Sequence, residues 1–287
     1  MTYKNRPIIR ILLVSFILIT SIYTFIQIFY FNHTTNTLKQ SSSRFEDDYF
    51  YYSNSVWQHT NPTHLNYPHN RFKAAFYTFV KSDRTSLTKL RSTIRNLEDQ
   101  FNKKYHYPYI IFSNEDLNEE FRELTSSIVA DSSTTIRFEK VNDDLYGYGP
   151  NTDLKKAEKA RNTLSDIMFG DNEDYRFQSR FMAGTIYRHP LMQELDYGWR
   201  FEAGTEYICP INEDPFQFMF ENNKTTSFSM ALYEYRETVP TLYQTVLDYA
   251  KDHIHWIQPF GDSNNLWHFI LNENNKFNYC HFWNNFQ

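Results

Sequence analysis

The chain has 287 residues, of which 41% are hydrophobic, 22% are charged and 18% are aromatic. Disordered proteins contain few aromatic residues, so this composition excludes a mostly disordered protein. The net charge of −5, from 29 basic and 34 acidic residues, gives no electrostatic sign of nucleic-acid binding, and we expect no nucleic-acid partner. Two cysteines are too few for a disulfide scaffold or a cysteine-rich zinc site.

A long segment without formal charge lies near the N-terminus. Residues 11–31 would form a helix of about 31 Å, close to the ~30 Å hydrocarbon core of a bilayer. Lys4, Arg6 and Arg10 come before this segment. The positive-inside rule therefore predicts a cytosolic tail at residues 1–10, a transmembrane signal anchor at 11–31 and a lumenal remainder. A buried core helix is the alternative.

The next segment differs in composition. Residues 32–70 are rich in Ser, Thr, Asn, Pro and His and keep no helical or alternating period, which is typical of a stem. Residues 71–287 then form one lumenal domain. Within it, Asn223 begins an Asn-Lys-Thr sequence in a polar stretch, which makes Asn223 a candidate glycosylation site.

The first part of this domain alternates between two patterns. Residues 74–80 and 109–112 are short apolar runs typical of buried strands, and residues 85–104 and 119–128 have the apolar spacing of amphipathic helices. This order predicts an α/β fold with a parallel sheet and crossover helices. Ligands bind such sheets beyond the carboxyl ends of the strands, so the turn at residues 81–83 is a candidate ligand loop. An ordinary solvated turn is the alternative.

The later part of the domain is less regular. The sequence predicts a charged helix at 153–168, a mixed segment with three arginines at 175–188, a strand pair at 197–208, a strand at 228–235 and a helix at 238–253. The dinucleotide-binding, P-loop, HExxH and GxSxG patterns are absent from the sequence. Their absence argues against several classes of oxidoreductase, NTPase and hydrolase.

A few polar residues in this later part are candidates for chemistry. Glu202 and Glu206 flank an Ala-Gly turn after an apolar strand end, where carboxylates hold Mn²⁺ or Mg²⁺ against a diphosphate; two solvated acids are the alternative. His281 lies in an aromatic cluster, as a ligand or as a core residue. Cys209 and Cys280 either pair in an oxidising lumen or remain two buried free thiols.

Several motifs occur in one order along the chain. They include Arg95–Asn102 (RNLEDQFN), Tyr175-Arg176, Tyr187–Leu191 (YRHPL), Trp199-Arg200 and His281–Phe286 (HFWNNF). Over about residues 72–287 this series resembles the fungal-type α-1,2-mannosyltransferases of glycosyltransferase family 15, the KTR/MNT group. The resemblance covers essentially the whole predicted lumenal part.

The resemblance implies a fold and an activity. The fold is a single Rossmann-like nucleotide-diphosphosugar transferase domain of the GT-A type, behind a transmembrane helix in the Golgi membrane. The donor is GDP-mannose, the cofactor is Mn²⁺, and mannose passes with retention to an α-mannoside of a glycoprotein or glycolipid. Retention through a covalent intermediate and retention by front-face attack both remain open.

The resemblance also implies roles for individual residues. Glu202 matches the first acid of the family's Glu-Pro-Asp metal motif, and Tyr175 matches a tyrosine near the reacting centre. Arg180 and His281 fall on motif positions near the nucleotide and the cleft. The guanosine-binding edge would include Phe79, Lys81 and Asp83.

The sequence departs from the family pattern in three respects. Ala203-Gly204 replaces the Pro-Asp that follows Glu202, and Gln287 stands where the family has a glutamate that is its candidate nucleophile. Family members continue beyond this position, so the resemblance implies an incomplete C-terminus. These departures keep a second hypothesis open: a catalytically impaired, membrane-anchored protein that binds GDP or a sugar.

Overall fold

The computed structural model describes residues 23–24, 65–130, 132–142, 145–149, 151–233, 235–256 and 280–283. The chain divides into two compact units, Met1–Gln58 and His59–Gln287. The predicted anchor at 11–31 lies outside the described residues except for Tyr23 and Thr24. No helix in the described ranges has both the length and the apolar character needed to cross a bilayer.

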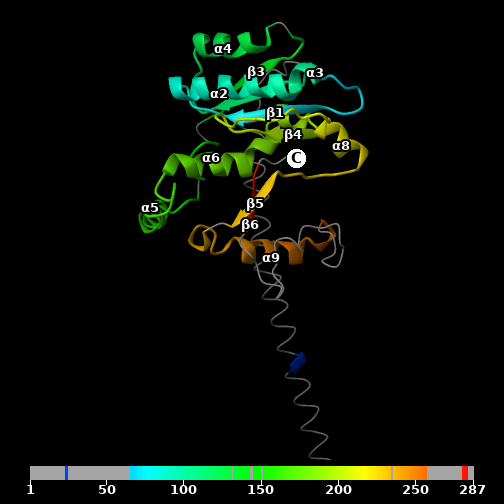
Figure 1. The fold of residues 1–287 in the computed structure, drawn as a ribbon. Coiled ribbons are helices and arrows are strands. Elements are labelled where there is room, and N and C mark those ends of the chain that lie inside the picture. Colours follow the sequence, from blue (N-terminus) through cyan, green and yellow to red (C-terminus); the bar gives the residue numbers. More distant parts are fainter. Residues whose placement is uncertain are drawn as a thin grey trace, which may run out of the picture. The chain divides into compact units, whose positions relative to one another are not determined.

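The centre of the domain is a four-stranded parallel sheet (Figure 1). Its strands are β1 (Ala74–Phe79), β2 (Tyr109–Ser113), β3 (Ile136–Lys140) and β4 (Tyr197–Arg200), in the order β3-β2-β1-β4. Every residue of β1 and β2 is buried, as expected for parallel strands covered on both faces. The predicted parallel sheet with crossover helices is confirmed.

The remaining elements are helices and one small sheet. The α-helices are α2 (Arg84–Leu97), α3 (Lys103–Tyr105), α4 (Glu119–Ser126), α5 (Leu154–Thr163), α6 (Glu173–Ala183), α7 (Pro190–Gln193), α8 (Pro215–Glu221) and α9 (Leu242–Asp252). Short 3₁₀ turns lie at Ser127–Val129, Thr185–Arg188, Arg236–Thr238 and Ile254–Trp256. β5 (Met230–Tyr233) and β6 (Cys280–Trp283) pair antiparallel.

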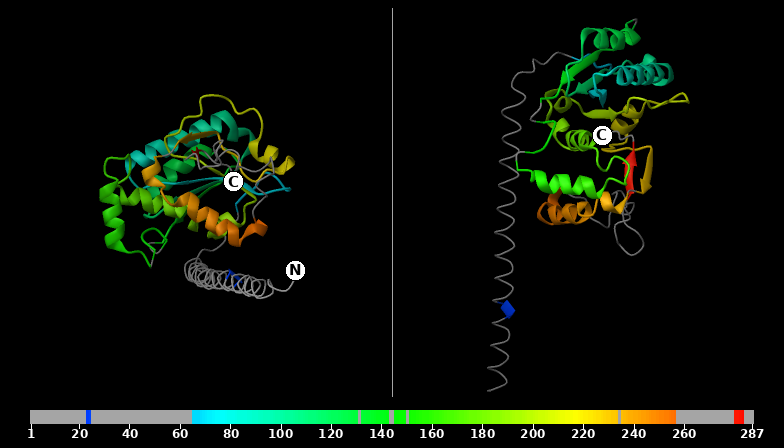
Figure 2. Two further views of the ribbon diagram at one scale, coloured as in Figure 1. Left: turned by 90° about the horizontal axis from the view of Figure 1, so that it is seen from below. Right: turned by 90° about the vertical axis from the view of Figure 1, so that its left-hand side faces the viewer.

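Helices cover both faces of the parallel sheet (Figures 1 and 2). Phe76 of β1 points to the face on which α2 and α4 lie, and it belongs to one buried cluster with Leu90 and Phe121. Phe79 of the same strand points to the opposite face, where its ring lies 5.7 Å from that of Phe181 in α6. The alternation of side chains along β1 thus builds two apolar layers.

The predicted helix at 85–104 is interrupted. α2 ends at Leu97, and Glu98–Asn102 form one π-helical turn. The Asn102 amide donates to Glu98 Oε1 at 2.7 Å and accepts from the Tyr107 N–H at 2.8 Å. Glu98 also accepts from the Tyr109 hydroxyl at 2.7 Å, and burial raises the pKa of its carboxyl. The motif at 95–102 therefore fixes the connection from α2 to β2.

The prediction of a strand pair at 197–208 is wrong in its second half. β4 ends at Arg200, and residues 201–208 form a turn and irregular chain. The backbone groups of Gly204, Thr205 and Tyr207 bond to side chains of α2, so they are not available for strand pairing. The other predicted segments correspond to α5, α6, β5 and α9 with shifted ends.

Candidate functional site

Glu202 lies two residues beyond the end of β4, at the carboxyl edge of the parallel sheet. This edge is where open α/β sheets bind ligands. The Glu202 carboxylate forms an ion pair with the Arg200 guanidinium, and the two side chains are 38% and 37% exposed. A half-exposed carboxylate is thus held in place by a cation at the edge of the sheet.

The turn that carries Glu202 is attached to α2. The Gly204 N–H donates to Thr93 Oγ1 at 2.9 Å, and the Thr93 hydroxyl donates to the Thr205 carbonyl at 3.0 Å. Gly204 has a φ of 105°, a conformation that residues with a Cβ rarely adopt. The Tyr207 N–H also donates to the Asn96 side chain. Helix α2 therefore fixes the turn, and with it the position of Glu202.

A buried tyrosine lies next to the ion pair. The pKa of the Tyr77 hydroxyl is raised, mainly by burial. Tyr187 and Glu202 raise this pKa further, and the charge of Arg200 lowers it. A Cβ on Gly198 would lie 2.9 Å from Tyr77 Cε1, so β4 needs glycine where the ring crosses it. Tyr77 therefore keeps its proton at neutral pH beside Glu202.

A second group of polar side chains joins the end of β1 to α6. Lys81 forms an ion pair with Asp174, and Asp174 Oδ1 accepts from the Tyr146 hydroxyl at 2.7 Å. The Tyr146 ring stacks on Phe79, with centroids 5.0 Å apart and planes inclined by 3°. Of the residues predicted at the guanosine edge, Phe79 is thus buried in the core and Lys81 is paired.

The rest of the turn at residues 81–83 is held by local contacts. The Ser82 N–H donates to Glu115 Oε2 at 2.8 Å and the Ser82 hydroxyl donates to the same carboxylate; these bonds lower the pKa of Glu115. Asp83 is the N-cap of α2 and accepts from the N–H groups of Thr85 and Ser86 at 2.8 and 3.0 Å. Asp83 therefore serves the helix terminus in this structure.

Arg180 supports a loop. Its Nη1 atom donates to the Gly147 carbonyl at 3.0 Å and to the Leu145 carbonyl at 3.4 Å. The loop at 145–149 follows β3 and carries Tyr146. Arg180 therefore stabilises the loop whose Tyr146 contacts Phe79. The role of Arg180 near the nucleotide stays a prediction.

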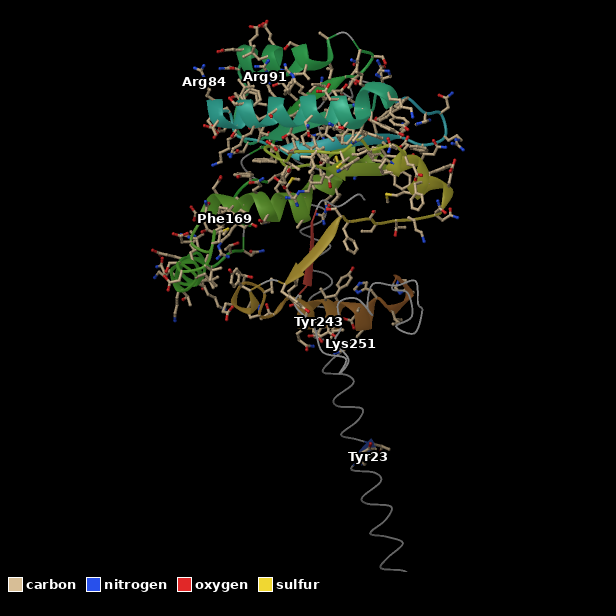
Figure 3. The ribbon with its side chains drawn as sticks, in the orientation of Figure 1. Tyr23, Arg84, Arg91, Phe169, Tyr243 and Lys251 are labelled. Carbon is tan, nitrogen blue, oxygen red and sulfur yellow. The ribbon has the colours of Figure 1, made fainter. Side chains whose placement is uncertain are left out.

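Tyr175 lies in the first turn of α6. Its ring is 46% exposed and stacks on Phe169 with centroids 4.9 Å apart; Figure 3 labels Phe169 beside the α5–α6 connection. His281 lies in β6 opposite Leu232, and its side chain is outside the described residues, as is Gln287. The roles predicted for Tyr175, His281 and Gln287 therefore stay predictions.

Two further candidates lie on the surface. Asn223 follows α8, is exposed and has a φ of 50°. Cys209 is an exposed free cysteine, so the structure contains no Cys209–Cys280 disulfide. The alternative of a free thiol applies at Cys209, although we expected it to be buried.

The described residues include no group of three or more His, Cys, Asp or Glu side chains close enough to hold a metal ion. Glu206 is exposed and is not gathered with Glu202 in such a group. Ions such as Mg²⁺ often take only one or two protein carboxylates when phosphate oxygens and water complete the coordination. Glu202 fits the part of a single protein ligand to a metal shared with a diphosphate.

Sequence reasoning missed the groups that position Glu202. Arg200 is adjacent to Trp199 in one of the family motifs, and that motif is the signal that could have singled it out. Thr93 and Asn96 bond to a segment 111 residues away along the chain or farther. Asn96 lies in the Arg95–Asn102 motif, whereas no local pattern marks Thr93.

Comparisons with known proteins give the family. A family profile described as glycolipid 2-alpha-mannosyltransferase matches residues 26–287. The chain belongs to glycosyltransferase family 15. It is 34% identical over 220 residues to glycolipid 2-alpha-mannosyltransferase 2 of Candida albicans and 35% identical over 223 residues to O-glycoside alpha-1,2-mannosyltransferase omh1 of Schizosaccharomyces pombe. These alignments cover 76% and 77% of this chain, and 46% and 55% of the relatives, so the chain spans about half the length of the curated relatives it matches.

Solved structures share the fold. Core-mannan synthase A (CmsA/Ktr4) of Aspergillus fumigatus in its Mn/GDP form matches with a TM-score of 0.67 and 24% identity, over 79% of this chain and 65% of that one. The mannosyltransferase Ktr4p of S. cerevisiae in complex with GDP matches with a TM-score of 0.68 and 23% identity, over 85% and 66%. The parallel α/β architecture of this chain is therefore that of known mannosyltransferases.

Proposed function

We propose that this chain is an α-1,2-mannosyltransferase that moves mannose from GDP-mannose to an α-mannoside acceptor with retention. Membership of family 15 and the activities for which the relatives are named support the proposal. The observation that carries it is the position of Glu202, on a turn fixed by Thr93 at the carboxyl edge of β4. This is the place where a GT-A type domain, the finer fold assignment that we propose here, would bind a sugar nucleotide.

Each neighbouring group has a part in this proposal. A bound Mn²⁺ would offset the negative charge that develops on the departing GDP. Glu202 would bind the metal, and Arg200 would orient the carboxylate beforehand. The Tyr77 hydroxyl, which stays neutral, adds no charge beside Glu202. The domain would hold the acceptor 2-hydroxyl against the donor, since correct positioning supplies much of such a rate enhancement.

We also propose that the protein is a single-pass type II protein of the Golgi membrane. The uncharged segment 11–31 and the basic residues before it support this topology. Asn223 is exposed and would carry a glycan if the domain is lumenal. Endoglycosidase treatment of the expressed protein should lower its apparent mass, and Asn223→Gln should abolish that change. A protein that protease degrades in intact vesicles would contradict the topology.

Binding of GDP to the full chain in detergent tests the metal site. Calorimetric titration with and without MnCl₂ should show that Mn²⁺ tightens GDP binding by about tenfold or more. Glu202→Gln should remove this enhancement, and the matched variant Glu206→Gln should keep it. The half-exposed ion pair with Arg200 contributes about 1 kcal/mol or less, so Glu202→Gln should remain folded. An enhancement that survives Glu202→Gln would exclude Glu202 as the ligand.

Turnover tests the transfer itself. The chain, incubated with GDP-mannose, Mn²⁺ and methyl α-mannoside, should release GDP and form an α-1,2-linked disaccharide that proton NMR identifies by its anomeric signals. A β-linked product would contradict retention. GDP binding without any product would contradict the transferase proposal and favour the impaired GDP-binding protein.

A further inference from the structure

A basic groove lies between α2 and α4, away from the turn that carries Glu202. It has a volume of about 470 Å³, within the range of ordinary ligand sites. Three arginines of α2 line it, Arg84, Arg91 and Arg95, and Glu120 is the one acid among the described residues that line it. Figure 3 labels Arg84 and Arg91 where α2 approaches α4.

The three arginines form one stripe on the helix. At 100° per residue they lie within about 40° of one another around the axis of α2. Thr93, which bonds to the Glu202 turn, lies about 160° or more from this stripe by the same measure. The groove and the candidate donor site therefore use opposite sides of α2, and an inference about the groove does not depend on the proposed function.

The charges of the stripe are not neutralised within the described part of the chain. None of the three guanidinium groups forms an ion pair there, and the Arg91 Nε atom is buried without a hydrogen-bond partner. Arg91 and Arg95 are one helical turn apart, a spacing at which like charges destabilise a helix. A repulsive arrangement of this kind has a reason to exist if an anionic partner binds it.

The shape of the groove selects the kind of anion. Eleven residues separate Arg84 from Arg95, which corresponds to about 16 Å along the helix. One phosphate or carboxylate cannot contact both ends, whereas about five residues of extended peptide span that length. Leu87, Phe121 and Leu124 supply an apolar floor between the cations, and apolar side chains of a peptide would pack there.

We propose that the α2–α4 groove binds an acidic peptide segment of a partner protein. Glutamate or aspartate side chains of the segment would pair with Arg84, Arg91 and Arg95, and apolar side chains between them would contact the floor. Ser92 and Asn118, which also line the groove, would hydrogen-bond to the peptide backbone. Because arginine presents a planar fork of donors, carboxylates can bind it through both oxygens.

The test is a titration of the full chain in detergent against fluorescein-labelled eight-residue peptides of alternating Glu and Leu. The anisotropy should rise on binding, and the affinity should fall as salt is raised from low to high concentration. The peptide in which Gln replaces Glu should bind at least about tenfold more weakly. Equal binding of the Glu and Gln peptides would overturn the proposal.

Matched variants separate the groove from general surface charge. Peptide binding should be lost in the triple variant Arg84→Gln, Arg91→Gln and Arg95→Gln. The control is a triple variant on the exposed face of α5, Lys155→Gln, Lys156→Gln and Lys159→Gln. It removes the same charge and should still bind the peptide. Thermal melting confirms that both remain folded. GDP binding should be the same in the two triple variants. A failure of this proposal can therefore be distinguished from a failure of the transferase proposal.

Two further ligands, a small phosphate and a lipid surface, test whether something other than a peptide occupies the groove. Inorganic pyrophosphate, added with EDTA, should compete only weakly; complete displacement of the peptide at low concentration would mean a small phosphate site instead. Vesicles of phosphatidylcholine and phosphatidylserine should bind the arginine variant and the unmodified chain alike. Binding of vesicles that requires the three arginines, without binding of the peptide, would overturn the proposal in favour of a lipid surface.

Discussion

The Thr93 hydroxyl accepts the Gly204 N–H at 2.9 Å and thereby links the middle of α2 to the turn that follows β4. It also donates to the Thr205 carbonyl at 3.0 Å, and Thr93 is 1% exposed. One buried hydroxyl thus holds a donor and an acceptor of the same turn. The position of Glu202 depends on a side chain that is hydrogen-bonded to the backbone of the turn and not to the carboxylate itself.

Thr93→Val should separate this positioning from the metal site. Valine keeps the volume but leaves one N–H and one carbonyl without partners, which should lower the free energy of unfolding by about 1–3 kcal/mol. The Mn²⁺ enhancement of GDP binding should weaken while metal-free GDP binding changes little. Urea denaturation and calorimetry measure the two effects. Thr88→Val, whose exposed hydroxyl bonds only to the Arg84 carbonyl, is the control; equal losses in both variants would contradict the role of Thr93.

Tyr107→Phe should destabilise the domain far from the candidate site. The Tyr107 hydroxyl donates to buried Asp214 at 2.7 Å, and Asp214 is the N-cap of α8. Removing this donor to a charged group should cost about 1.5–3 kcal/mol in urea denaturation, without change in GDP affinity. Tyr105→Phe, which loses only an exposed contact with Lys104, should cost about 0.5 kcal/mol or less. A similar cost for the two variants would show that the Asp214 bond is not important.

The centre of the sheet could be predicted because its sequence signal is local. β1 and β2 are buried on both faces and appear as short apolar runs between charged residues. β3 was missed because it is an edge strand: Ile136, Arg137 and Phe138 are only half-buried, and its sequence IRFEK mixes charged and apolar residues. The segment that forms α6 was not predicted to be a helix because its arginines interrupt the apolar pattern. One of them, Arg180, bonds to a neighbouring loop.

The candidate site could be predicted only in part, because its geometry comes from distant residues. The sequence identified Glu202, but the apolar residues Tyr207 and Ile208 suggested a second strand where the chain instead bonds to Thr93 and Asn96 of α2. A helix cap such as Asp83, followed by Thr and Ser at the start of an amphipathic pattern, was predictable from its own sequence. We instead predicted that Asp83 belongs to a ligand loop, because the turn at residues 81–83 lies at the carboxyl edge of the sheet.

His189 should make the domain less stable in acid. Burial, with a smaller contribution from Arg137, lowers the pKa of His189 from 6.5 to about 3. Its Nδ1 atom accepts the Leu191 N–H at 3.2 Å at the start of α7, which requires an unprotonated nitrogen. Between pH 6.5 and 3 the unfolded chain therefore binds a proton that the folded chain does not. The stability that this histidine contributes is complete above pH 6.5 and is lost as the pH falls, by up to about 1.4 kcal/mol per unit.

His189→Asn isolates this contribution, because asparagine can cap a helix but does not titrate in this range. The free energy of unfolding, measured in urea at a series of pH values from 7 to 4.5, should fall less steeply for His189→Asn than for the unmodified chain. Parallel curves for His189→Asn and the unmodified chain would mean that the buried imidazole is not the source of the acid sensitivity.

Arg180→Lys should loosen the loop at 145–149 while keeping the positive charge. Both bonds come from Nη1 of the rigid guanidinium, whereas the lysine ammonium is a point charge on a flexible and shorter side chain. Amide exchange in the loop should therefore accelerate by about tenfold, the equivalent of one lost hydrogen bond. Arg122→Lys, on the other face of the sheet, loses a bond to the Leu117 carbonyl and should change exchange near α4 only. Because the loop carries Tyr146 against Phe79, weaker GDP binding by Arg180→Lys should accompany the faster exchange. If GDP binding fell while exchange in the loop stayed the same, Arg180 would act on the nucleotide directly and its contact with the loop would be secondary.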